Sequence, residues 1–280
     1  MKKLLNKFLP LAYGAYLNTI SSFSIKKASE KGFQILLTPR KGRVLPHQES
    51  FLNEAKDRKV QVGDIILQVY RWYGKKETVL LLHGWESNSF RWRNLIGKLQ
   101  AEDYNIIAFD APAHGYSTGK LFHVPLFTEC TKIMVDLYNP KNIIGHSVGG
   151  MTAIYSQYEY PNSTVEKIVG IGAPSNLTGF MRQFQHTLQL NKKVMLGLEH
   201  YFENKFHFKA TEFSIDQFVP HLHQKGLLIH DVLDSITPFQ GSANIHRNWP
   251  ESKLVKTEGL GHSMHQDLVN DHVLKFLKTP

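Results

Sequence analysis

The sequence has almost no cysteine, and no linker or repeat divides it. Cys130 is the only cysteine among 280 residues, so the chain cannot form an internal disulfide and has no cysteine-based metal site. No low-complexity tract, internal repeat or Gly/Ser-rich linker is present. The apolar stretch at residues 8–17 is too short to span a bilayer. These features exclude a disulfide-stapled fold and a repeat protein.

The overall composition is that of an ordinary globular chain. It is 42% hydrophobic, 11% aromatic and 20% charged, which excludes a disordered or collagen-like protein. The formal net charge is +9, which is enough to attract anionic surfaces without identifying one. Because the basic residues are scattered and no nucleic-acid-binding module is present, we expect no nucleic-acid partner.

The amino-terminal segment combines lysines with an apolar helical pattern. Lys7 and Pro10 interrupt the apolar stretch and no small-residue cleavage site follows, so we expect a cytoplasmic protein rather than a secreted one. Apolar residues from Leu5 to Phe23 recur at helical spacing. Two interpretations remain open: this helix packs on its own protein, or residues 1–27 make a peripheral contact with a membrane surface.

From Asp64 onward, short apolar runs alternate with longer helical patterns, which is typical of a mostly parallel sheet flanked by helices. Several of the runs are uniformly apolar, as expected for strands covered on both faces. The predicted strands are residues 65–71, 78–82, 105–109, 142–144, 167–171, 227–230 and 253–256. The predicted helices are residues 91–101, 126–138, 148–158, 238–249 and 266–277.

Residues 174–223 interrupt this alternation. The segment is long, rich in Phe, Gln and His, and helical in pattern, so we predict a cap inserted between two sheet strands. We therefore divide the chain into a helical or extended segment at residues 1–60, which packs on the core, and an α/β domain at residues 61–280 that carries this cap.

The segment Gly145-His146-Ser147-Val148-Gly149 matches the pattern G-x-S-x-G. It directly follows a predicted strand and precedes a predicted helix, which is the context that this motif requires. Gly145 and Gly149 remove side chains that would clash in the sharp turn. Ser147 is therefore the candidate nucleophile.

A serine nucleophile needs a histidine base and a carboxylate that orients the histidine. His262 lies in the loop between the last predicted strand and the last predicted helix, whereas its rival His265 is expected inside that helix. Asp234 lies in the loop after the strand at residues 227–230, with Asp231 as a competitor in the same loop. The order Ser147, Asp234, His262 is the one expected for this architecture.

The chain resembles the α/β-hydrolase superfamily over residues 65–278. The resemblance rests on five stretches: residues 82–85, residues 109–117, the turn at Ser147, the loop at Asp234, and Gly261-His262. It implies an α/β-hydrolase fold with a helical cap. It also implies that the loop starting at His83-Gly84 supplies the backbone N–H of Trp85 to an oxyanion hole, with the N–H of Val148 as the second donor.

These residues together predict a serine hydrolase that cleaves a carboxylic ester or related small acyl substrate through an acyl-enzyme, without organic cofactor or metal. Asp110 and His114 are expected to fix a loop. The alternatives are an acyltransferase, thioesterase or perhydrolase with the same triad, a lipid hydrolase at a membrane surface, and a ligand-binding module without turnover. His200, His207, His221 and His223 are not expected to bind metal, because no cysteine or suitably spaced carboxylate joins them.

Overall fold

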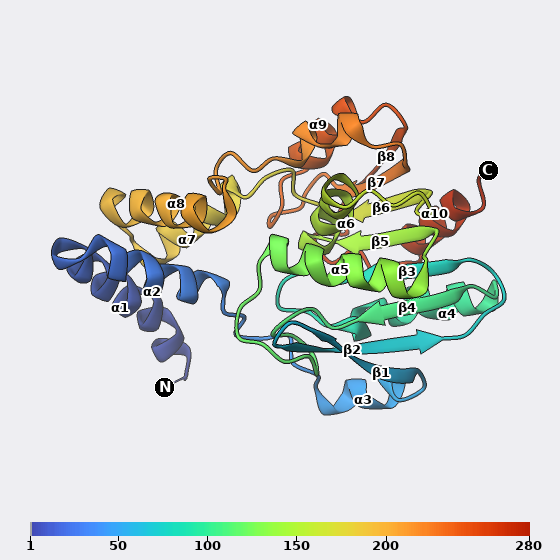
Figure 1. The fold of residues 1–280 in the computed structure, drawn as a ribbon, viewed down its shortest axis with the longest axis horizontal. Helices are drawn as coiled ribbons and strands as arrows, with labels where there is room; N and C mark the ends of the chain where they lie inside the picture. Colours follow the sequence, from blue (N-terminus) through green and yellow to red (C-terminus); the bar gives the residue numbers. More distant parts are fainter. Residues whose placement is uncertain (1) are drawn as a thin grey trace. The chain divides into compact units, whose positions relative to one another are not determined.

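The computed structural model describes residues 2–280, and side chains from residue 8 onward. An eight-stranded sheet has the order β1-β2-β4-β3-β5-β6-β7-β8 (Figure 1). β1 and β2 are antiparallel, β2 is antiparallel to β4, and the other pairs are parallel. The strands are β1 (Lys56–Val62), β2 (Ile65–Trp72), β3 (Thr78–Leu82), β4 (Asn105–Phe109), β5 (Asn142–His146), β6 (Lys167–Ile171), β7 (Lys225–Asp231) and β8 (Ser252–Thr257).

Helices cover both faces of this sheet. In Figure 1, α5 and α6 lie in front of the strands and α4 and α10 lie behind them. Because the central strands are buried between these layers, their runs are uniformly apolar. The helices of this part are α3 (Pro46–Leu52), α4 (Arg93–Ala101), α5 (Val124–Tyr138), α6 (Val148–Glu159), α9 (Gln240–Asn248) and α10 (Asp267–Leu277). The structure confirms the predicted mostly parallel sheet between helices.

The sequence analysis missed β1 and α3. The first four residues of β1, Lys56–Lys59 in the chain, are exposed and three of them are basic, so no alternating apolar pattern marks the strand. β1 forms because all of its residues pair with β2. As the edge strand of the sheet, it keeps charged side chains in water, which is a common property of edge strands.

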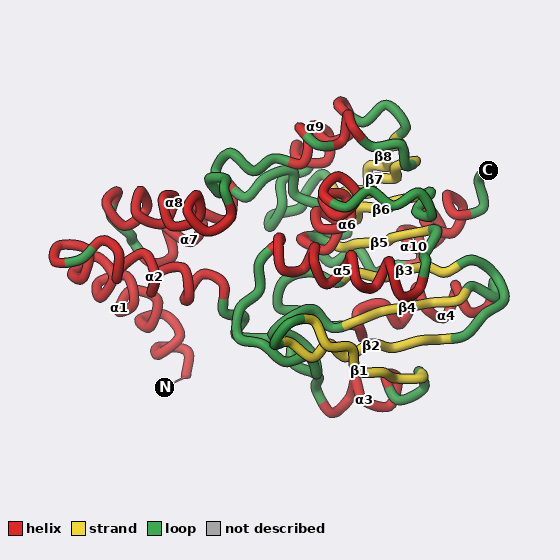
Figure 2. The backbone as a smooth tube through the Cα atoms, viewed as in Figure 1, coloured by secondary structure: helices red, strands yellow, loops and turns green. Residues whose placement is uncertain are grey.

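Four helices form a separate compact unit from residues 1–38 and 176–214. They are α1 (Lys2–Phe23), α2 (Ile25–Leu37), α7 (Thr178–Leu188) and α8 (Lys192–Phe206), drawn in red in Figure 2. Phe33 of α2 lies against Tyr201 and Phe202 of α8, with ring centroids 4.9 and 5.2 Å apart. In α1, a Cβ on Gly14 would lie only 1.6 Å from the carbonyl oxygen of Leu188, so the close approach requires glycine.

The observed division differs from the predicted one at residues 1–60 and 174–223. Residues 1–38 group with the inserted helices, whereas residues 39–60 belong with the sheet. Leu17 of α1 and Phe33 of α2 are buried, and α1 contacts α7 and α8 while α2 contacts α8, a pairing of distant segments that no local pattern shows. Much of the predicted apolar face of α1 stays exposed, including Leu9, Tyr16 and Phe23. The helical character predicted for the inserted segment is confirmed. Among residues 2–280, no helix is both long and apolar enough to cross a membrane.

Candidate active site

Ser147 lies in a sharp turn between β5 and α6, as its motif predicts. Its backbone has φ 55° and ψ −126°, a conformation that costs a non-glycine residue on the order of 1–3 kcal/mol. Neighbouring segments hold this strained turn in place. A Cβ on Gly145 would lie 2.2 Å from the carbonyl oxygen of Gly149, and a Cβ on Gly149 would lie 2.2 Å from that of Leu82. Both glycines are therefore required by the packing of the turn.

The carboxylate of Asp234 lies against the imidazole of His262. Asp234 Oδ2 is 2.7 Å from His262 Nδ1, and the Asp234 side chain is fully buried. Burial raises the pKa of Asp234, but hydrogen bonds from His262 and from the backbone N–H groups of Thr237 and Ile236 outweigh it and hold the pKa below its ordinary value. Asp234 is therefore held as a carboxylate, which favours a proton on Nδ1 of His262.

Asp231 has a different set of partners. Its Oδ2 accepts hydrogen bonds from Thr257 Oγ1 at 3.0 Å and from Leu260 N at 2.8 Å, and its Oδ1 accepts one from Leu233 N. Asp231 therefore ties together the two loops that carry Asp234 and His262. Between the two acids that the sequence left in competition, the structure places Asp234 at the imidazole.

The sequence analysis missed two side chains that also contact the Asp234 carboxylate. The hydroxyl of Thr237 lies 2.9 Å from Asp234 Oδ2 and 3.0 Å from His262 Nδ1. Buried His230 at the end of β7 places its Nε2 3.3 Å from the same Oδ2. Thr237 was visible only as a loop residue and His230 only as the end of a strand, so no pattern marked either one.

His146, the residue before Ser147, links the turn to the His262 loop. Its Nε2 donates to the backbone carbonyl of His262 at 2.8 Å, and the two imidazole centroids are 4.8 Å apart. The N–H of Ser147 donates to Ile171 O at 2.8 Å. A Cβ on Gly172, the residue after Ile171, would lie 3.6 Å from the His262 ring. These contacts bring the Ser147 turn and the His262 loop together at the carboxyl edge of the sheet.

The loop after β3 packs against the same turn. A Cβ on Gly84 would lie 3.0 Å from Ser147 Cβ, so the loop approaches the turn closely. His83 Nδ1 donates to Gly84 O at 2.8 Å, while its Nε2 accepts the N–H of Ala111 at 2.9 Å. Burial lowers the pKa of His83 to about 4, so the ring is neutral and can accept this hydrogen bond. The neutral imidazole fixes the path of the loop that contains Trp85.

His114 and Asp110 hold this loop from the opposite side. His114 Nε2 accepts the N–H of Glu86 at 3.0 Å, and burial is the main cause that lowers the pKa of His114 to about 3. Asp110 accepts hydrogen bonds from Tyr70, from the N–H and hydroxyl of Ser89, and from the N–H of Tyr116. Both residues therefore fix loops, as predicted.

His265 precedes α10 rather than lying inside it, so the expectation for that residue is wrong. It is exposed, and its carbonyl accepts a hydrogen bond from Asn94 Nδ2 at 3.2 Å. Among residues 2–280, no three His, Cys, Asp or Glu side chains are grouped so that they could hold a metal ion.

Two family models match the chain. The model described as alpha/beta hydrolase fold matches residues 77–211, and the model described as TAP-like protein matches residues 210–280. Together they span the sheet from β3 to β8 and all the candidate residues described above.

The chain is similar in sequence to a curated hydrolase and in fold to solved structures of proteins with different names. An uncharacterized hydrolase of Bacillus subtilis, YugF, is 20% identical over 253 residues, which cover 72% of this chain and 90% of YugF. An esterase from Exiguobacterium antarcticum is 17% identical with a TM-score of 0.63, covering 80% of this chain and all of the esterase. A bromoperoxidase from Bacillus anthracis is 18% identical with a TM-score of 0.64, covering 80% of this chain and all of that structure. With its sheet order and its family-model matches, this chain belongs to the α/β-hydrolase superfamily.

Proposed function

We propose that this protein is a serine hydrolase that cleaves a carboxylic ester or related acyl substrate through an acyl-enzyme. The observation that carries the proposal is the 2.7 Å contact between Asp234 Oδ2 and His262 Nδ1, together with the hydrogen bond from His146 that joins the His262 loop to the Ser147 turn. The names of the similar hydrolase and esterase support this class of reaction.

In this proposal His262 is the general base. A buried carboxylate at Nδ1 keeps the proton there, so Nε2 is left with its lone pair and can take the proton of Ser147. The serine oxygen then attacks the acyl carbon and forms a tetrahedral intermediate. His262 returns the proton to the leaving group, and water repeats both steps on the acyl-enzyme to release the acid.

The oxyanion of the intermediate needs fixed N–H donors. We assign this role to the backbone N–H groups of Trp85 and Val148, since Gly84 approaches Ser147 closely and Val148 begins α6. Loss of one such donor typically lowers the rate by about 10²–10³. His83 and His114 support the Trp85 loop and so act as positioning residues.

A fluorophosphonate probe tests the proposal directly because it reacts with an activated serine. We expect the wild-type protein to be labelled at near-neutral pH and to hydrolyse p-nitrophenyl esters, and Ser147→Ala to do neither while remaining folded. Substitution of Ser163, an exposed serine outside the site, by Ala is the matched control and should leave labelling intact. A folded wild-type protein that is not labelled would contradict the proposal and favour a binding module.

A further inference from the structure

A basic pocket lies next to the loops of the candidate active site. Three segments form its walls: residues 40–48, residues 86–93 between β3 and the first residue of α4, and the loop after β8 at residues 263–265. The cavity has a volume of about 620 Å³, which is large enough for an organic ligand. Glu86 directly follows Trp85 and Ser263 directly follows His262, so two of the walls continue from the proposed catalytic loops. We call this cavity the arginine pocket.

The charges in the arginine pocket are unbalanced. Five cationic side chains line it and only one acidic side chain does, Glu86, whose carboxylate accepts the backbone N–H of Arg40 at 2.9 Å. In the described part of the chain, none of the five cations forms an ion pair with a carboxylate. The five are Arg40, Lys41, Arg43, Arg91 and Arg93.

Arg91 is the most buried of these cations. Its Nη2 donates to the backbone carbonyl of Ser263 at 2.9 Å, and its buried Nε finds no acceptor among the described residues. Burial, and to a lesser extent the charge of Arg93, lowers the pKa of Arg91 to about 9. Two arginines therefore lie close together in a partly desolvated site without a counter-ion, an arrangement that a bound anion would stabilise.

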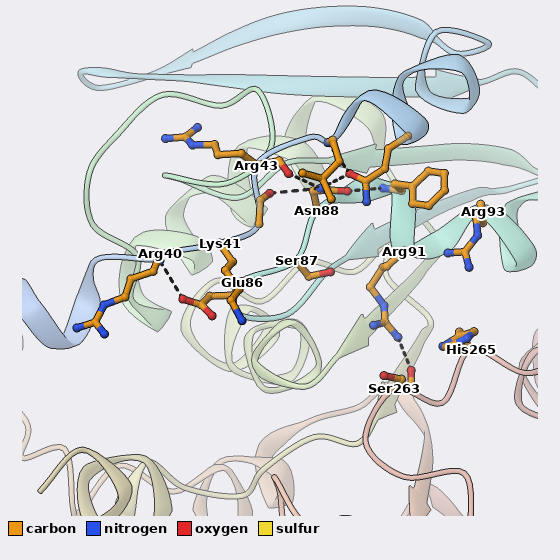
Figure 3. Close-up of a pocket in the computed structure, with 14 residues that line it drawn as sticks. Arg40, Lys41, Arg43, Glu86, Ser87, Asn88, Arg91, Arg93, Ser263 and His265 are labelled. Atoms are coloured by element: carbon orange, nitrogen blue, oxygen red, sulfur yellow. Dashed lines mark hydrogen bonds between the residues drawn. The ribbon is translucent and has the colours of Figure 1, made fainter. Parts of the chain in front are cut away.

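The cations lie at both ends of the arginine pocket. Figure 3 shows Arg91, Arg93 and His265 gathered around one end, while the guanidinium groups of Arg40 and Arg43 extend from the other. The Arg43 guanidinium is already engaged, because its Nη1 donates to the carbonyls of Gly115 and Ser117. Burial and then the charges of Arg91 and Arg93 lower the pKa of His265. At the end next to His265, the donors without a carboxylate partner belong to Arg93 and to Arg91, whose Nη2 already donates to Ser263 O.

From this arrangement we propose that the arginine pocket binds the phosphate group of a phosphorylated acyl substrate. A phosphate monoester carries about −1.5 to −2 charges at neutral pH, which matches two arginines without a counter-ion. Guanidinium groups present paired N–H donors that fit phosphate oxygens. Glu86 and Ser263 line the arginine pocket and directly follow Trp85 and His262, so the group that links the phosphate to the acyl carbon would pass these two residues. The assignment of a substrate rests on the proposed function, whereas phosphate binding itself does not.

Binding can be measured without catalysis. Inorganic pyrophosphate is titrated into the Ser147→Ala protein by calorimetry at constant ionic strength. We expect binding at a single site that Arg93→Gln weakens about tenfold or more, because a charge-assisted hydrogen bond is lost. Arg58→Gln is the matched control, since Arg58 is an exposed arginine of β1 outside the arginine pocket. Equal weakening by both variants, or no binding, would overturn the proposal.

Two matched substrate pairs show where the phosphate is attached. Acetyl-phosphopantetheine and acetyl-pantetheine differ only by a phosphate on the leaving group, and p-nitrophenyl esters of 3-phosphonopropionate and butyrate differ by a phosphonate on the acyl side. We expect the anionic member of one pair to have a kcat/KM about tenfold higher, a preference that Arg93→Gln abolishes and Arg58→Gln retains.

Arg93→Lys, which keeps the charge but removes the paired N–H donors, provides a second variant should Arg93→Gln fail to fold, and it should also weaken pyrophosphate binding. Equal rates within both pairs would overturn the substrate assignment. Hydrolysis of neither pair by a protein that binds pyrophosphate would instead contradict the proposed hydrolase function.

Discussion

Replacing Asp234 by Asn keeps the size of the side chain and removes only the charge of the group that faces His262. Asp234 Oδ1 accepts two backbone N–H groups, from Ile236 at 2.8 Å and from Thr237 at 3.0 Å. The oxygen of the new amide is therefore held at that position. The amide NH₂ group must then face His262 Nδ1, which is 2.7 Å from Oδ2 in the present protein.

An NH₂ group at this position reverses the tautomer of His262. Nδ1 would accept a hydrogen bond from Asn, so the ring proton would lie on Nε2, and Nε2 could no longer take the proton of Ser147. The opposite amide orientation would set the NH₂ group against two backbone N–H donors, at about 1–3 kcal/mol for each unsatisfied group. A wrong tautomer in a Ser-His-Asp triad lowers kcat by about 10⁴. That factor corresponds to about 5.5 kcal/mol in activation free energy.

The assay is hydrolysis of p-nitrophenyl acetate together with the rate of fluorophosphonate labelling, with near-ultraviolet circular dichroism as the test of folding. Asp231→Asn is the matched control, since it makes the same change in the same loop without touching the imidazole. It should lower the unfolding free energy by about 1–3 kcal/mol through its contacts with Thr257 and Leu260 and keep at least a tenth of kcat. A folded Asp234→Asn protein that retains a tenth of kcat would refute the reasoning, as would equal losses in both variants.

Three further outcomes are expected. Thr237→Val should lower kcat about tenfold and the unfolding free energy by about 1–3 kcal/mol, because it removes the hydroxyl between Asp234 and His262. Thr237→Ser keeps a hydroxyl and should restore both kcat and the unfolding free energy. If the two variants had equal kcat in the same ester assay and equal stability in urea unfolding, this hydroxyl would have no role. Gly97→Ala in α4 should raise the unfolding free energy by about 0.5–1 kcal/mol, because glycine inside a helix is less stable than alanine and an added Cβ meets no atom within 4 Å. A lower urea midpoint for the variant would show that the added Cβ does clash. Acidification should destabilise the fold: the pKa values of His83 and His114 are lowered to about 4 and about 3, so below the ordinary histidine pKa of about 6.5 the unfolded chain binds protons that the folded protein does not. Each histidine then removes up to about 1.4 kcal/mol per pH unit between pH 6 and pH 4, and a urea midpoint that is constant over this range would contradict the assignment.

Local features of the sequence predicted the sheet and the position of the turn at Ser147. Apolar runs such as residues 79–82 and 106–109 are short and bounded by turn residues, which is how buried strands appear in a sequence. The glycines around Ser147 report the backbone conformation of a few consecutive residues, so the motif could be recognised without knowledge of distant contacts.

Contacts between distant segments decided the rest. Asp231 ends β7 and Asp234 lies three residues later in the loop that follows, and only the path of the chain in space shows which carboxylate meets His262. The segments that contain Thr237, His146 and His262 carry no pattern that indicates their hydrogen bonds to one another.

The helical unit and the arginine pocket depend on tertiary structure for the same reason. Each combines segments far apart in the chain, residues 1–38 with 176–214 in one case and residues 40–48 and 86–93 with 263–265 in the other. Periodicity reports which face of an element is buried, but not which other element buries it. The sequence by itself therefore determined the class of fold and the candidate nucleophile, and the tertiary structure determined the partners of each candidate catalytic side chain and brought the unpaired arginines together.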